Sequence, residues 1–193
     1  NRRGAMSLYH QLQAAGADDP GAAALVGPDG LTLSRADLLR LAVSGKDRVV
    51  DVDDPVAMVV DQLAAQASGV STLRLPTSGT SGTPRTIERT VTSWTASLPA
   101  FDVAIGLRAD DVIWAPGAGS ATLTLFAIWQ GLAAGVPVIA SGAWRGIPEP
   151  IADAVREVSE DGLFWTMAGD DEDVRALEVG KVMFATSFGV GRV

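Results

Sequence analysis

The nine residues from Thr77 to Arg85, TSGTSGTPR, gather groups that bind anionic oxygen atoms. Five of the nine side chains carry hydroxyls, two glycines allow close backbone approach, and Arg85 adds a cation. The run has neither a helical nor a strand period, so it predicts a solvated loop or a loop that holds a ligand. Amide donors, hydroxyls and a guanidinium together are attributes of a phosphate site. It is not a Walker A loop, because G-x-x-x-x-G-K-[ST] is absent.

Short apolar segments alternate with segments of helical period along the chain, which predicts βαβ units and a mostly parallel sheet with flanking helices. The uniformly apolar strands favour a sheet covered on both faces. The predicted strands are 23–26, 31–34, 47–52, 70–76, 111–116, 136–141, 162–167 and 181–188. The predicted helices are 7–15, 35–45, 53–69, 90–107, 121–135, 149–162 and 170–180. The quoted loop therefore lies after a strand and ahead of a helix, and ligands of α/β folds bind outside the carboxyl ends of strands.

Polar residues mark the starts of two predicted helices. Ser34 with Asp37 predicts a capping box, and Asp54 followed by Pro55 predicts a cap with proline in the first turn. Asp51, Asp53 and Asp54 together also resemble a metal cluster, but we favour the cap for Asp54. Pro99 must bend its helix or lie near a boundary.

The loop resembles the signature loop of the adenylate-forming superfamily, which comprises acyl- and aryl-CoA ligases, peptide-synthetase adenylation domains and luciferases. That pattern reads approximately [ST]-S-G-[ST]-[ST]-G-x-P-[KR]. It is matched by Thr77, Ser78, Gly79, Thr80, Ser81, Gly82, Pro84 and Arg85, with Thr83 at the variable position. Arg85 stands where Lys is usual, and Thr86 where Gly is common. The order of elements over roughly residues 22–190 is similar in outline, so the fold expected is part of the family's large N-terminal domain.

The resemblance implies a site for ATP and Mg²⁺ in a ligase that activates a carboxylic acid, with CoA or a carrier protein as thiol acceptor. Hydroxyls and amides of Thr77, Ser78, Gly79, Thr80, Ser81, Gly82, Thr83 and Pro84 would form the phosphate-binding segment. Arg85 would act as the catalytic cation that meets phosphate oxygens. No residue is assigned as a protein ligand to the metal.

Several later motifs of that family have no counterpart in the sequence. These are the aromatic-Gly-x-[ST]-Glu motif, the Asp that binds ribose, and the C-terminal domain with its catalytic Lys. The P-[LM]-x-H segment is replaced by PGAGSATL, where Gly117, Gly119 and Ser120 predict a small, open turn. Three explanations stay open: a fragment of a longer ligase, a shortened enzyme completed by another subunit, or a degenerate, non-catalytic homologue that binds nucleotide or acts as a scaffolding or oligomerising subunit. Homo- or hetero-oligomers are expected.

The composition of the chain limits which partners and which kinds of active or metal site it can have. The 193 residues carry a formal net charge of -8, contain no cysteine, and have one histidine, His10. An acidic surface disfavours nucleic acid and anionic membrane as partners. The lack of cysteine excludes disulfides and thiolate catalysis, and one histidine excludes multi-histidine metal sites. No stretch is apolar for long enough to span a membrane. We expect residues 1–5 to be an expression remnant, residues 6–193 to form a single α/β domain, and the location to be cytoplasmic.

Overall fold

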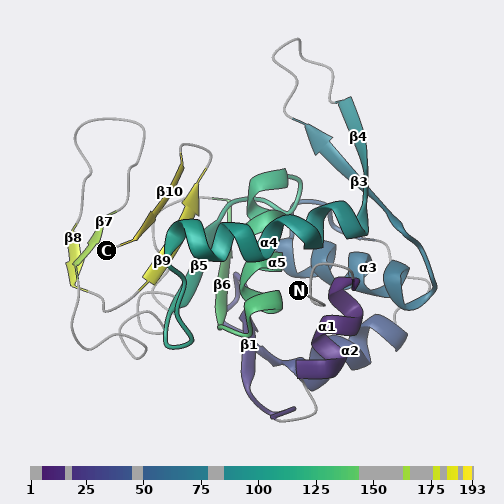
Figure 1. Cartoon of the computed structure of the whole chain (residues 1–193), viewed down its shortest axis with the longest axis horizontal. Coiled ribbons are helices and arrows are strands. Elements are labelled where there is room, and N and C mark those ends of the chain that lie inside the picture. The colour runs from purple at the N-terminus through teal and green to yellow at the C-terminus, as the bar shows by residue number, and fades with distance from the viewer. Residues whose placement is uncertain are drawn as a thin grey trace.

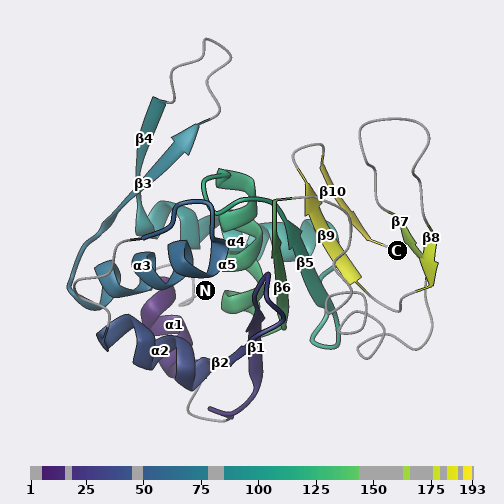
Figure 2. The ribbon, with the colours of Figure 1, turned by 180° about the vertical axis from the view of Figure 1, so that it is seen from behind.

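The computed structural model describes residues 6–15, 19–44, 50–77 and 85–143, and the backbone of short strands after residue 143. At 15, 76, 77 and 85 it also describes only the backbone. Figure 1 shows the arrangement of the elements, and Figure 2 shows them from behind. The helices are α1 (Leu8–Ala15), α2 (Arg35–Ser44), α3 (Pro55–Ala67), α4 (Val91–Ile105) and α5 (Thr122–Ala134). The strands are β1 (Ala23–Val26), β2 (Thr32–Ser34), β3 (Thr72–Thr77), β4 (Arg85–Thr90), β5 (Val112–Pro116), β6 (Val138–Gly142), β7 (Leu163–Trp165), β8 (Ala176–Glu178), β9 (Val182–Thr186) and β10 (Gly189–Arg192).

A six-stranded sheet in the order β10-β9-β5-β6-β1-β2 forms the centre of the fold. The pairs β1·β6, β5·β6 and β5·β9 are parallel, whereas β2 and β10 join antiparallel at the two edges. The predicted α/β class with a mostly parallel sheet is therefore confirmed. Every residue of β6 and Val112–Ala115 of β5 are buried, as expected for central parallel strands.

Helix α5 lies at the centre of the hydrophobic core. It packs directly on β5, β6 and β9, and α1, α3 and α4 pack on α5 in turn. Trp129 and Ile128 of α5 are fully buried together with Leu63 of α3. The described helices consequently lie on one side of the sheet (Figures 1 and 2). The helix predicted over 149–162 lies outside the described residues.

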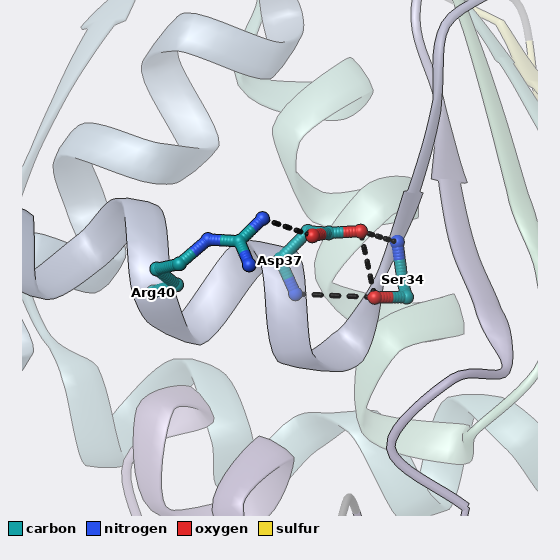
Figure 3. Close-up of polar contacts among 3 residues, drawn as sticks. All are labelled: Ser34, Asp37 and Arg40. Carbon is teal, nitrogen blue, oxygen red and sulfur yellow. Dashed lines mark hydrogen bonds and ion pairs between the residues drawn. The ribbon is translucent and has the colours of Figure 1, made fainter.

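The predicted helix caps are confirmed. Ser34 Oγ accepts from the Asp37 amide at 3.1 Å, and Asp37 Oδ2 accepts from the Ser34 amide at 3.0 Å and from its hydroxyl at 2.7 Å (Figure 3). These bonds to Ser34 hold the pKa of Asp37 below its usual value, and Arg40, whose Nη2 lies 2.5 Å from Asp37 Oδ1, adds to the effect. Asp54 Oδ1 accepts from the Val56 amide at 2.8 Å and starts α3. Pro99 lies inside α4 rather than at its boundary.

Four differences from the predicted elements stand out. No strand was predicted at β4, of which only Arg85 had been assigned to the loop and Thr90 to a helix, and β10 was not expected. Residues 50–52, the described part of a predicted strand, form no strand. Ala176–Glu178 is a strand that pairs with β7, where a helix was predicted. Among the described residues, the side chains of Trp94, Trp114 and Trp129 are buried.

Candidate functional site

The hydroxyl-rich loop connects the two strands of a separate antiparallel hairpin. Strands β3 and β4 form a two-stranded sheet of their own, with a ladder that runs from Thr72↔Thr90 to Thr77↔Arg85. The hairpin extends away from the helices and the six-stranded sheet (Figures 1 and 2). The loop follows a strand, β3, as expected, but a second strand, β4, intervenes between the loop and the helix α4 that was expected to come next.

The structure places the ends of the predicted site and not its interior. Thr77 and Arg85 face each other as the last pair of the ladder. The residues between them, Ser78, Gly79, Thr80, Ser81, Gly82, Thr83 and Pro84, lie outside the described residues. All seven therefore belong to one connection between two paired strands.

The hairpin is anchored to the core along β3. Leu73 and Leu75 are 4% and 2% exposed and belong to the hydrophobic core. Their cross-strand partners, Arg89 and Ile87, are exposed. One strand of the hairpin is therefore held by burial, and the other by its pairing with the first.

Polar contacts close the base and brace the middle of the hairpin. The Val91 amide donates to the Ser71 carbonyl at 2.8 Å. Thr90 Oγ1 accepts from the Ser93 amide at 3.2 Å, so β4 ends directly in the N-cap of α4. Arg74 Nε lies 3.1 Å from Glu88 Oε1 across the two strands. Both side chains of this ion pair are largely exposed, so salt screens it and its contribution is small.

A second group of residues meets at the carboxyl ends of the parallel strands, where ligands of α/β proteins bind. The Gly117 amide donates to the Gly142 carbonyl at 2.7 Å and joins the ends of β5 and β6. The Gly119 amide donates to the Asp53 carbonyl at 2.9 Å, and Ser120 Oγ donates to Asp53 Oδ1 at 2.9 Å. The starts of α3 and α5 are therefore tied together at this edge.

The turn before α5 is filled rather than open. A β-carbon at Gly119 would lie 2.6 Å from the Asp54 carbonyl oxygen, and one at Gly117 would lie 2.0 Å from Thr124 Oγ1. Gly119 is also buried. The open turn expected from the glycines is consequently wrong: their lack of a side chain lets the chain pack against itself here. The sequence carried no signal for this contact.

The acidic residues near this edge act as structural groups. Asp54 caps α3, and Asp51 Oδ1 accepts from the Asp53 amide at 3.0 Å. Among the residues that the structure describes, no group of three or more histidine, cysteine or acidic side chains is placed to hold a metal ion. No helix within the same residues is long and apolar enough to cross a membrane.

Comparisons with known proteins agree on the fold. A complex of VinN with 3-methylaspartate is 12% identical, with a TM-score of 0.55, over 80% of this chain and 64% of that chain. The o-succinylbenzoate CoA synthetase (MenE) from Bacillus subtilis, in complex with the acyl-adenylate intermediate OSB-AMP, is 11% identical, with a TM-score of 0.56, over 77% of this chain and 59% of that one. The N-terminal domain of FACL13 from Mycobacterium tuberculosis, bound to an inhibitor, is 14% identical, with a TM-score of 0.53, over 79% and 60%.

The chain thus spans about 59–64% of the length of these structures. Residues 149–193 match a family model described as a domain of unknown function (DUF8403). No curated protein matches the chain by sequence. These similarities place the architecture: it is an α/β fold that resembles the N-terminal domain of adenylate-forming enzymes.

Proposed function

We propose that the chain is part of an ATP-dependent ligase that activates a carboxylic acid as its acyl-adenylate. The observation that carries the proposal is the match of residues 77–85 to the family's signature loop, combined with a fold that resembles adenylate-forming enzymes. One structure of similar fold holds an acyl-adenylate, and another, a nonribosomal peptide synthetase, holds AMPPNP. Both structures support the same class of reaction for this chain.

In the proposed reaction a substrate carboxylate oxygen attacks the α-phosphorus of ATP, the bond to the β-phosphate breaks, and pyrophosphate leaves. The hydroxyls of Thr77, Ser78, Thr80, Ser81 and Thr83 would donate to the β- and γ-phosphate oxygens. Arg85 would neutralise the charge that builds on the leaving pyrophosphate. Catalysis would rest on positioning and on this electrostatic stabilisation. Mg²⁺ would arrive with the phosphates and share in that neutralisation.

A second candidate is a non-catalytic subunit that binds nucleotide or acts as a scaffold. The absence of the aromatic-Gly-x-[ST]-Glu motif from these 193 residues favours it. The ligase and a non-catalytic subunit that binds nucleotide both predict that the loop binds ATP. They differ in whether pyrophosphate is released when a carboxylic acid is supplied.

The deciding experiment is calorimetric titration with ATP and Mg²⁺, with AMP as the reference ligand. We expect ATP to bind at least about tenfold more tightly than AMP, because only ATP carries β- and γ-phosphates for the loop. Ser81→Ala combined with Arg85→Ala should remove that difference. The matched control is Ser44→Ala with Arg40→Ala, which changes the same residue types on the exposed side of α2.

Equal affinities for ATP and AMP in the unmodified chain would reject the loop as a phosphate site. If ATP is preferred, a screen of carboxylic acids for pyrophosphate release separates the two candidates. Release would support the ligase. Nucleotide binding without release for any acid would support the non-catalytic subunit.

A further inference from the structure

The central strands β5 and β6 present one face to α5 and another face away from it. A β-carbon at Gly131 of α5 would lie 3.3 Å from Ile113 Cδ1 and 2.2 Å from Val138 Cγ2, so these two side chains point toward the helix. Side chains alternate along a strand, and the neighbouring residues therefore point the other way. This opposite side of the two strands, the far face, consists of Val112, Trp114, Ile139 and Ser141.

The far face is buried, although the described helices lie on the other side of the sheet. The exposed fractions of Val112, Trp114 and Ile139 are only 2%, 2% and 1%. Trp114 Nε1 donates to Ser141 Oγ at 3.0 Å, which pairs these two polar groups within the face. The structure contains a single chain. The atoms that exclude water from the far face consequently belong to this chain and lie outside its described helices.

The handedness of crossovers indicates which part of the chain this is. Strands β6 and β9 are both parallel to β5 and lie on its two sides. The chain first crosses from β5 to β6 through α5, and it later returns past β5 from β6 to β9. A crossover between parallel strands is right-handed in about 98% of cases. Because the direction is reversed, the same hand places the second crossover on the face away from α5.

Residues 149–162 lie in this second crossover and have the pattern of an amphipathic helix. On a helix, four apolar side chains would lie within roughly 100° of one another, and four charged ones within a similar arc on the opposite side. The apolar set is Ile151, Ala154, Val155 and Val158. The charged set is Asp153, Arg156, Glu157 and Glu160. Strands β7 and β8 of the same crossover pair with each other in a separate sheet.

We propose that residues 149–162 form a helix whose apolar side packs on the far face. The region that matches the DUF8403 model, residues 149–193, would then supply this helix together with β9 and β10 of the central sheet. This region of unknown function is thus the unit that completes the α/β sheet and not a separate domain. The inference does not depend on the proposed function.

Cross-linking of cysteine pairs in the whole chain tests the proposal, because the chain has no cysteine of its own. Ile139→Cys is combined in turn with one cysteine in the segment, and a short bifunctional thiol reagent is added. We expect a cross-link with at least one of Ile151→Cys, Val155→Cys and Val158→Cys. We expect none with Asp153→Cys or Glu157→Cys. Tryptic cleavage at Arg145 separates the two cysteines, so mass spectrometry identifies each linked pair.

The matched control replaces Ile139→Cys by Val138→Cys. These neighbouring residues of β6 are equally buried but point to opposite faces, and Val138→Cys should give no cross-link with the segment. Should Ile139→Cys prevent folding, as judged by circular dichroism, Ser141→Cys is a nearly isosteric replacement on the same face. Folded variants of the far face that form no cross-link with the apolar positions would overturn the proposal. Equal cross-linking from both faces, or from the apolar and charged positions alike, would overturn it as well.

Discussion

Gly119 and Asp53 join the starts of two helices through one backbone hydrogen bond of 2.9 Å. Ser120, 67 positions after Asp53, adds a bond of 2.9 Å from its hydroxyl to the Asp53 carboxylate. Helices α3 and α5 therefore begin from a shared junction beside the carboxyl ends of β5 and β6. The junction lies at the edge of the sheet where ligands of α/β proteins bind.

Gly119→Ala should destabilise the fold, because the added carbon would lie 2.6 Å from the Asp54 carbonyl oxygen. We expect the free energy of unfolding to fall by about 1–3 kcal/mol, the range for overpacked sites. Urea denaturation measures it. Gly21→Ala is the control, because its nearest atom would lie 3.8 Å away, and it should be as stable as the unmodified chain. A fully stable Gly119→Ala variant would contradict the packed junction.

Arg35→Ala should lower stability more than Arg40→Ala. Arg35 is partly buried, and its Nη2 donates to the Gly135 carbonyl at 2.6 Å, which caps the C-terminal end of α5. We expect the loss of this hydrogen bond to lower the free energy of unfolding by about 1–2 kcal/mol. Arg40 is 73% exposed and should change the urea midpoint little. Equal urea midpoints for the two variants would mean that water satisfies the Gly135 carbonyl as well as the Arg35 guanidinium does.

Gln62 and Trp129 should show energetic coupling in a double-mutant cycle. Trp129 Nε1 donates to Gln62 Oε1 at 2.7 Å in the buried contact of α3 with α5. Gln62→Met would leave the indole donor without this acceptor, whereas in a Trp129→Phe background no donor remains. We expect the cost of Gln62→Met to be at least about 1 kcal/mol smaller in that background. Additive effects of the two changes would show that the bond contributes nothing to stability.

Asp37 should make stability depend on acid pH. The bonds from Ser34, with help from Arg40, lower the pKa of Asp37 in the folded state. The stabilisation is therefore fully present above the unfolded pKa of about 3.9 and is lost as pH falls through the lower folded value. The advantage of the unmodified chain over Asp37→Asn should accordingly be constant near neutral pH and shrink below about pH 4. Urea midpoints across that range measure it.

Ser34→Ala provides the internal control for that pH effect. It removes the hydroxyl that contributes most to the lowered pKa of Asp37. In this background the substitution Asp37→Asn should produce a smaller acid-dependent difference. If the difference stays the same, the capping box does not cause the pH dependence.

Local signals explain which parts of the fold were predictable. The caps at Ser34 and Asp54 depend on residues two or three positions apart, so the sequence contains both partners within one turn. The two predicted strands 23–26 and 31–34 flank the turn-forming sequence Pro-Asp-Gly, and they do pair as the antiparallel hairpin of β1 and β2, with Gly30 at φ 77°. The helix predicted over 121–135 likewise ends at Gly135, which adopts the left-handed conformation.

The missed elements depend on distant contacts. Strand β4 reads RTIERT, and all of its described side chains are exposed, so it has no buried face to produce an apolar alternation. Its pairing with β3 determines its structure. The predicted strand at 47–52 failed for the reverse reason. Its valines suggested a buried face, but Val52 is exposed and the segment leads into the cap of α3. For the candidate site, the sequence identified the loop by its composition and not the hairpin that carries it.

The final pair of the β3–β4 ladder has an entropic consequence for the loop. Because Thr77 and Arg85 are paired, their Cα atoms lie about 5 Å apart. When β3 and β4 pair, the two ends of the seven-residue segment 78–84 are brought together. The entropy cost of closing this loop is therefore met during folding. A phosphate ligand that residues 78–84 would hold under the proposed function does not have to meet this cost again on binding. More of its contact energy then remains as affinity.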